Sequence, residues 1–229
     1  MSRVQPVFVH GWGFGPAFWT PLVTALGWMD ACVLDLGFLG AESGPPAQAA
    51  QQLQALQGAG QAVLGVGHSL GFMWLAGQMG LSATDRLVGI NAFAAFAART
   101  DFASGVPVRV LQRMLKGVSS TPEKVLADFR AVCGAPAVDG PLSPQNLRYG
   151  LDLLISGDVR PVMARKRAQC SVLAARQDPL VPPAMTEDSF AEGVAVQWTD
   201  GGHLLPQTNV GDCAAFLQAA RRKMEQGAG

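Results

Sequence analysis

Short apolar runs alternate with helical patterns along much of the sequence, and this alternation constrains the fold more than any other feature. Six runs have the length and composition of buried strands. They lie at residues 7–9, 31–36, 62–66, 87–90, 170–175 and 194–198. Helical patterns at residues 16–26, 47–56 and 70–79 separate the first four runs. Such alternation predicts an α/β fold, with a mostly parallel sheet and helices on both faces.

The middle of the sequence breaks this pattern, because it has no strand-like run. It carries helix-start signals instead, at Thr121-Pro122-Glu123 and at Ser143-Pro144. An all-helical insertion of this length indicates a lid over a site on the core, and a bulky linker is the alternative. We predict a core of residues 1–92 and 168–229 with a helical lid insertion at residues 93–167.

One pentapeptide carries a candidate nucleophile. Gly67-His68-Ser69-Leu70-Gly71 fits G-x-S-x-G and lies between the strand-like run 62–66 and an almost wholly apolar helical pattern. In α/β-hydrolases this motif is a sharp strand-to-helix turn that presents a serine at the end of a strand. The two glycines allow close packing of strand and helix. We predict that Ser69 is the nucleophile of a serine hydrolase.

A serine hydroxyl needs a positioned base and an acid that orients the base. Among three histidines, His203 follows a strand and a Gly-Gly turn near the C-terminus, so we predict that it is the base. Asp178 comes just after the run 170–175 and is the predicted acid, with Asp200 and then Asp158 as alternatives. The order of serine, acid and histidine is the order found in α/β-hydrolases.

The developing oxyanion needs backbone N–H donors. The N–H of Leu70, directly after the nucleophile, is one predicted donor. The second is expected in the turn His10-Gly11-Trp12-Gly13, from the Trp12 N–H. An ordinary glycine-rich turn is the alternative interpretation of these residues.

Several segments together resemble one family. They are Val7-Phe8-Val9-His10-Gly11-Trp12-Gly13, Phe18-Trp19, Gly67-His68-Ser69-Leu70-Gly71, Leu151-Asp152-Leu153-Leu154, Asp158-Val159-Arg160 and Asp178-Pro179-Leu180-Val181-Pro182. Over most of its length the chain is similar to the pimeloyl-[acyl-carrier-protein] methyl ester esterase family of biotin synthesis.

This resemblance implies a hydrolase core with a helical cap and, as substrate, the methyl ester of a dicarboxylic acyl chain on a carrier protein. It implies that Ser69, Asp178 and His203 form the triad. It also implies that Trp12 and Leu70 are the oxyanion pair and that Trp12 contacts the substrate. Phe129 would line the acyl channel, with simple core packing as the alternative.

A basic stripe bears on the substrate. Arg109, Arg113 and Lys116 recur at helical spacing in the segment 107–116, opposite an apolar face that includes Val110. They would suit docking of an acidic acyl carrier protein, and a solvated helix face is the alternative. Two other functions stay open: a general short-chain carboxylesterase or thioesterase acting on free esters, and a non-catalytic receptor or nucleotide-binding protein on the same scaffold.

Composition narrows the remaining possibilities. The formal net charge of +0 gives no reason to expect nucleic acid or a membrane surface as a partner. No apolar run approaches the ~20 residues of a spanning helix, and no signal peptide is recognisable. The four cysteines are far apart, which favours free thiols in a reducing compartment. We expect a cytoplasmic enzyme that uses no metal and no cofactor.

Overall fold

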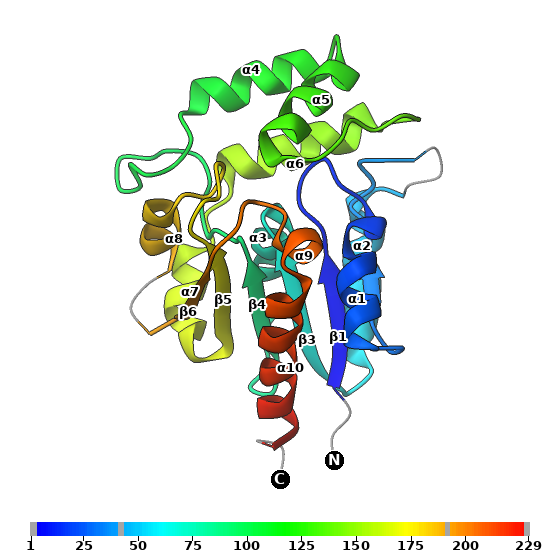
Figure 1. The fold of residues 1–229 in the computed structure, drawn as a ribbon, viewed down its shortest axis with the longest axis vertical. Helices are drawn as coiled ribbons and strands as arrows, with labels where there is room; N and C mark the ends of the chain where they lie inside the picture. The colour runs from blue at the N-terminus through cyan, green and yellow to red at the C-terminus, as the bar shows by residue number, and fades with distance from the viewer. Residues whose placement is uncertain (1–3, 41–43, 191–192, 227–229) are drawn as a thin grey trace.

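The computed structural model describes residues 4–40, 44–190 and 193–226. Within these residues six strands form one sheet in the order β2-β1-β3-β4-β5-β6, and every neighbouring pair is parallel (Figure 1). The strands are β1 (Val4–Val9), β2 (Cys32–Leu34), β3 (Ala62–His68), β4 (Arg86–Ile90), β5 (Cys170–Ala175) and β6 (Ala195–Thr199). The six predicted runs are therefore confirmed as strands, and the predicted α/β fold class is confirmed with them.

Helices fill the connections. Those of the first half are η1 (Pro16–Trp19), α1 (Thr20–Leu26), α2 (Pro46–Gly58) and α3 (Leu70–Gln78). Between β4 and β5 come α4 (Val108–Val118), α5 (Pro122–Cys133), α6 (Pro144–Ser156), α7 (Arg160–Lys166) and η2 (Arg167–Gln169). The last are α8 (Pro183–Ser189), α9 (Leu205–Thr208) and α10 (Val210–Gln226).

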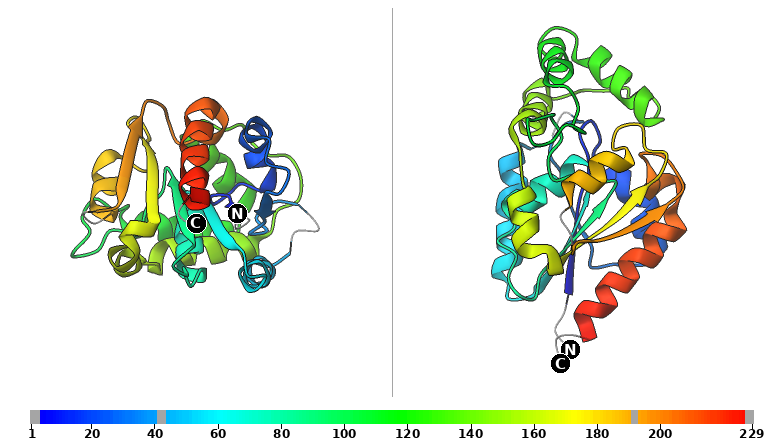
Figure 2. Two further views of the ribbon diagram at one scale, coloured as in Figure 1. Left: turned by 90° about the horizontal axis from the view of Figure 1, so that it is seen from below. Right: turned by 90° about the vertical axis from the view of Figure 1, so that its left-hand side faces the viewer.

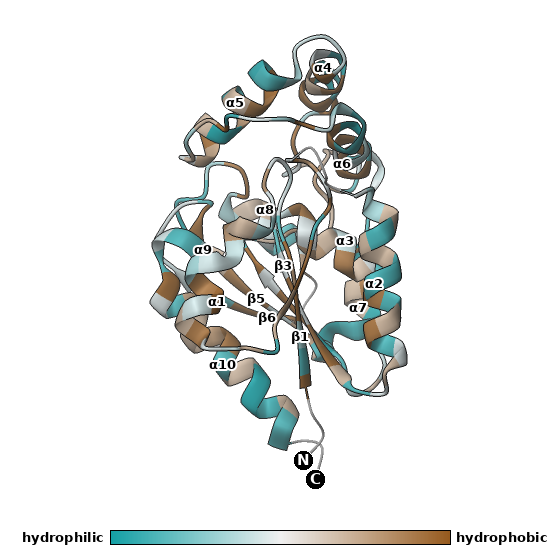
Figure 3. Cartoon of the chain, turned by 90° about the vertical axis from the view of Figure 1, so that its right-hand side faces the viewer, coloured by the Kyte–Doolittle hydropathy of each residue, from teal (hydrophilic) through white to brown (hydrophobic). Residues whose placement is uncertain are grey.

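Helices pack on both faces of the sheet, and successive strand residues point to opposite faces. On one face Phe8, between Val7 and Val9 in β1, packs in a cluster with apolar residues of α1 and α10, among them Leu22 and Leu217. On the other face Val7 and Val9 belong to a cluster that includes α2 and α3. Figure 2 shows these helices on opposite sides of the sheet, and Figure 3 colours them by the hydropathy of their residues.

Helices α4, α5 and α6 lie together beyond the carboxyl ends of the strands (Figure 1). The sequence signals predicted the starts of α5 and α6, and Ser143 caps α6 by accepting a hydrogen bond from the Asn146 N–H at 3.2 Å. The sequence did not predict α7. It lies beside the sheet, where Met163 is buried in the core, and not over the strand ends.

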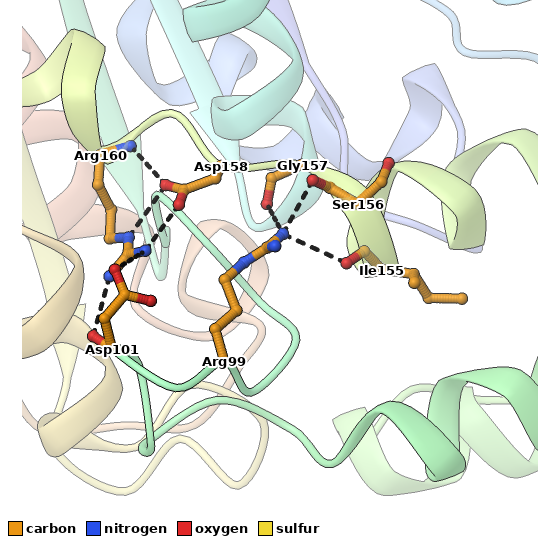
Figure 4. Close-up of polar contacts among 7 residues, drawn as sticks. All are labelled: Arg99, Asp101, Ile155, Ser156, Gly157, Asp158 and Arg160. Atoms are coloured by element: carbon orange, nitrogen blue, oxygen red, sulfur yellow. Dashed lines mark hydrogen bonds and ion pairs between the residues drawn. The ribbon is translucent and has the colours of Figure 1, made fainter.

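A polar network fastens the segment before α4 to the junction of α6 and α7 (Figure 4). The Arg99 guanidinium donates hydrogen bonds to three carbonyls at the C-terminal end of α6, those of Ile155, Ser156 and Gly157, at 2.8–3.3 Å. Arg160 forms ion pairs with Asp158 at 2.6 Å and Asp101 at 2.9 Å. The hydrogen bond from Arg160 holds the pKa of Asp158 below its usual range. These contacts join the two ends of the α4–α6 segment to each other and to α7.

In the described part of the chain, no helix is long and apolar enough to cross a membrane.

Candidate active site

The direction of strand addition reverses between β1 and β3, which are neighbours in the sheet although β2 lies between them in sequence. In open parallel sheets, ligands bind outside the carboxyl ends of the strands at such a reversal. The turn of residues 10–13 follows β1 and Ser69 follows β3, so both lie at this point. The fold therefore places the predicted site residues where a crevice is expected.

Ser69 has a strained backbone. It stands between β3 and α3 with φ 53° and ψ −123°, a conformation that non-glycine residues seldom adopt. A Cβ at Gly71 would lie 2.2 Å from the carbonyl oxygen of Val9, and one at Gly67 would lie 2.3 Å from the backbone of Phe72. Both glycines are therefore required by close backbone contacts. The Ser69 hydroxyl makes no cap hydrogen bond to α3.

His203 and Asp178 are paired and buried. The His203 Nδ1 lies 2.8 Å from Asp178 Oδ2, and the residues are 1% and 4% exposed. The other oxygen of Asp178 accepts hydrogen bonds from the N–H groups of Leu180 (2.8 Å) and Val181 (3.0 Å). The carboxylate accepts the proton on Nδ1, which leaves Nε2 as the basic nitrogen. This Nε2 is buried and has no hydrogen-bond partner among the described residues.

Neither alternative acid is hydrogen-bonded to the His203 side chain in the described part of the chain. Asp200 is exposed and accepts a hydrogen bond from the Gln177 side chain at 3.1 Å. Asp158 is bound to Arg160, as described above. The structure thus brings Asp178, and neither of the other two predicted candidates, to the base.

The two predicted oxyanion donors are free. Neither the Trp12 N–H nor the Leu70 N–H, which begins α3, donates a hydrogen bond within the described ranges. The turn after β1 also lies close to Ser69, since a Cβ at Gly11 would be 3.1 Å from Ser69 Cβ. The turn and the start of α3 are therefore adjacent at Ser69.

Helices α5 and α6 are fixed to this turn. The Trp12 indole N–H donates to the carbonyl of Leu147 in α6 at 2.8 Å. Arg130 of α5 donates to the carbonyl of Gly13 at 2.9 Å. Phe129, which is half-buried, packs edge-to-face on Trp12 with ring centroids 4.7 Å apart. Phe129 thus lies at the predicted oxyanion turn. Ser69 is only 6% exposed beneath these elements.

Two side chains that the sequence did not single out for a role at this site contact the segment that carries His203. The buried ring of His68 lies 4.6 Å from that of His203, and His68 Nε2 is 2.8 Å from the His203 carbonyl oxygen. Asn91, which follows β4, donates to the carbonyl of Gly202 at 2.8 Å. The only sequence signal for Asn91 was a polar residue directly after a buried strand. Burial, and then the proximity of His203, hold the pKa of His68 well below its usual value.

The basic stripe of α4 faces solvent. Arg109, Arg113 and Lys116 are all exposed. The predicted opposite face is only partly correct, because Leu111 is buried whereas Val110 is 40% exposed.

The described residues contain no cluster of side chains suited to a metal ion. All four cysteines are free. Burial raises the pKa of Cys133 and Cys213 to about 12 and that of Cys170 to about 11. These three thiols therefore behave as buried apolar groups.

A parallel sheet with a strained serine after a central strand, and an Asp-His pair after two later strands, defines the α/β-hydrolase class. Residues 7–216 match the alpha/beta hydrolase family, and the chain belongs to that family.

Solved structures show the same fold. A bromoperoxidase from Bacillus anthracis is similar with a TM-score of 0.78 and 19% identity, over 96% of this chain and 93% of that one. An esterase from Exiguobacterium antarcticum has a TM-score of 0.75 and 14% identity, over 96% and 92% of the two chains. An enol-lactonase from Burkholderia xenovorans LB400 has a TM-score of 0.73 and 14% identity, over 96% of this chain and 92% of that one. A comparison with curated proteins gave no match.

Proposed function

We propose that the protein is a serine carboxylesterase in which Ser69, His203 and Asp178 form the catalytic triad. The observation that carries the proposal is the buried His203, whose Nδ1 is bound to Asp178 while its Nε2 has no partner among the described residues. A neutral imidazole held in this tautomer is a base ready to take a proton. The strained turn presents the Ser69 hydroxyl at the same strand ends.

In the proposed reaction, Ser69 Oγ attacks the ester carbonyl carbon as its proton passes to His203 Nε2. The free N–H groups of Trp12 and Leu70 stabilise the resulting oxyanion. His203 then returns the proton to the leaving alcohol, and an acyl-enzyme remains on Ser69. Water, deprotonated by His203, attacks this acyl group. The bond to Ser69 Oγ then breaks as His203 gives the proton to that oxygen, which releases the acid and restores the serine and the neutral imidazole. Asp178 stays ionised and orients the imidazole throughout.

A direct test uses a fluorophosphonate and a p-nitrophenyl butyrate assay. We expect the reagent to label Ser69 once per chain in the native enzyme and to label no other residue. Ser69→Ala should keep its thermal unfolding midpoint while kcat falls by at least about a thousandfold, since removal of a triad member leaves little of the catalysis. Retention of more than about a hundredth of kcat would contradict the nucleophile assignment.

For the substrate we propose the methyl ester of pimeloyl-[acyl-carrier protein]. The family resemblance supports this choice, and so do the exposed cations of α4 beside the helices that cover Ser69. Phe129, whose ring packs edge-to-face on that of Trp12, would contact the acyl chain. Hydrolysis of free short-chain esters is the second candidate, since the triad itself does not require a carrier. The charge-reversal experiment below separates the two.

A further inference from the structure

The loop that carries His203 has little stiffness of its own. Two glycines precede the histidine, and Gly201 has φ +135°, a backbone conformation that favours glycine. Nothing lies within 4 Å of the position that a Cβ of Gly202 would occupy. Side-chain packing therefore does not hold Gly202, and the position of the imidazole depends on hydrogen bonds from other segments.

Gly201 exchanges hydrogen bonds with Gln177, which follows β5, at 2.7 and 3.1 Å. The carbonyls of the next two residues accept hydrogen bonds from the ends of the two central strands. His68, the last residue of β3, donates from Nε2 to the His203 carbonyl at 2.8 Å. Asn91, directly after β4, donates from its amide nitrogen to the Gly202 carbonyl at 2.8 Å. Two consecutive carbonyls are thus held from neighbouring strands, over separations of 135 and 111 residues.

Each side chain has a second attachment that fixes its orientation. The Asn91 carbonyl oxygen accepts from the N–H of Ala175 at 2.8 Å, so one amide joins the end of β5, three residues before Asp178, to the His203 loop. The His68 ring lies between Phe18, at 4.5 Å, and the His203 ring. Its Nδ1 is buried without a partner in the described residues, so a second proton there would have no acceptor. His68 therefore stays a neutral Nε2–H donor.

We propose that His68 and Asn91 are positioning residues, which hold the backbone at residues 202–203 and so aim the His203 imidazole at Ser69 while it remains bound to Asp178. The proposal rests on the role assigned to His203 above. Neither residue is expected to touch substrate. A displacement of about 1 Å in a catalytic group can cost about a hundredfold in rate, so the two hydrogen bonds bear directly on turnover.

Matched variants separate positioning from stability. His68→Phe keeps a planar ring against Phe18 but removes the donor, whereas His68→Gln keeps an N–H donor. Asn91→Asp keeps the acceptor for Ala175 and loses the donor to Gly202. The control is Asp85→Asn, which alters a side chain of similar burial (3% exposed, against 1% for Asn91) at the opposite end of β4.

Asp85 accepts from the N–H groups of Val63 and Ser82, at 2.8 Å each, and contacts nothing at the site. Its variant should lower the thermal midpoint and leave kcat within about twofold of wild type. We expect His68→Phe and Asn91→Asp to lower kcat for a small ester by about 10- to 100-fold with KM nearly unchanged. His68→Gln should recover most of the loss. The double variant should lose less than the product of the single losses.

A second measurement does not depend on turnover. The chain has three histidines, so nitrogen-15 NMR of the imidazoles can report the His203 tautomer directly. We expect one Nδ1–H form in the wild-type protein and a mixture in His68→Phe and Asn91→Asp. An unchanged His203 spectrum together with unchanged kcat in both variants would overturn the proposal, as would an equal loss in Asp85→Asn. If the wild type hydrolysed no ester, the proposed function would fail while the spectra still tested the positioning.

Discussion

Asp178 uses both of its carboxylate oxygens in hydrogen bonds of different kinds. One is bound to His203 Nδ1, and the other accepts two backbone N–H groups of its own loop. The loop therefore holds the carboxylate in place, and the carboxylate in turn orients the imidazole. Asp200, only three residues from His203 in sequence, accepts a hydrogen bond from the Gln177 side chain instead.

Exchanging each acid for its amide tests this difference. Asp178→Asn should lower kcat by about ten-thousandfold, because an amide can hold the wrong imidazole tautomer. Asp200→Asn should change kcat by no more than a few fold, since its oxygen contacts an exposed side chain. Both are measured with p-nitrophenyl butyrate on protein checked for folding by circular dichroism. A larger loss in Asp200→Asn would mean that the acid is misassigned.

His68 makes stability depend on pH. Its folded-state pKa lies well below the ordinary value of 6.5 because the ring is buried and next to His203. Below about pH 6.5 the unfolded chain binds a proton at this residue that the folded protein does not. The free energy of unfolding is therefore highest above pH 6.5 and falls as pH decreases toward the folded pKa, by up to about 1.4 kcal/mol per pH unit.

Urea unfolding at pH 7.0, 6.0 and 5.0 measures this loss. The His68→Gln variant should lose less stability than wild type over the same interval, because glutamine does not titrate. The comparison within one pH series cancels the contribution of the other histidines. Equal losses in the two proteins would show that His68 titrates alike in the folded and unfolded states.

At the scale of elements, sequence patterns predicted most helices and all strands, but not every side-chain exposure or every contact between distant elements. Apolar runs and helix-start signals are local, and they located all six strands and the starts of α5 and α6. The exposure of Val110 and the existence of α7 depend on neighbours far away in sequence. The same is true of His68. Its motif fixed its backbone, whereas its hydrogen bond to residue 203 spans 135 residues and leaves no local pattern.

The exposed face of α4 carries a prediction about partners. Changing Arg109, Arg113 and Lys116 to Glu should reduce kcat/KM for pimeloyl-carrier methyl ester by at least about tenfold and leave p-nitrophenyl butyrate unaffected. Charge reversal replaces attraction to an acidic carrier by repulsion, which acts mainly on association. The wild-type advantage should shrink as salt shortens the Debye length from about 8 Å.

Two other results would be informative. Equal losses on both substrates would point to a damaged helix packing. No loss on either would make the stripe an ordinary solvated face and would favour the free-ester function.

At the scale of the whole molecule, the elements that cover the site are joined to the turn that carries the proposed oxyanion donor Trp12. Trp12 and Arg130 link residues 12–13 to α6 and α5, and the network around Arg99 and Arg160 fastens the ends of the α4–α6 segment. The sequence predicted an insertion and its helices. It did not predict these links. Those of Trp12, Arg130 and Arg99 join a side chain to a distant backbone carbonyl, and that of Arg160 to Asp101 joins two side chains 59 residues apart, and neither kind of contact has a local signature in the sequence.

The separation of the site residues along the chain also has a consequence for folding. Ser69, Asp178 and His203 come together only when β3, β4, β5 and β6 are all paired in register, and parallel pairing of distant segments is intrinsically slow. Collapse and helix formation can precede that pairing, so a partly folded chain has secondary structure and no active site. Recovery of esterase activity after dilution from denaturant therefore marks the last stage of folding, later than the return of the helical signal.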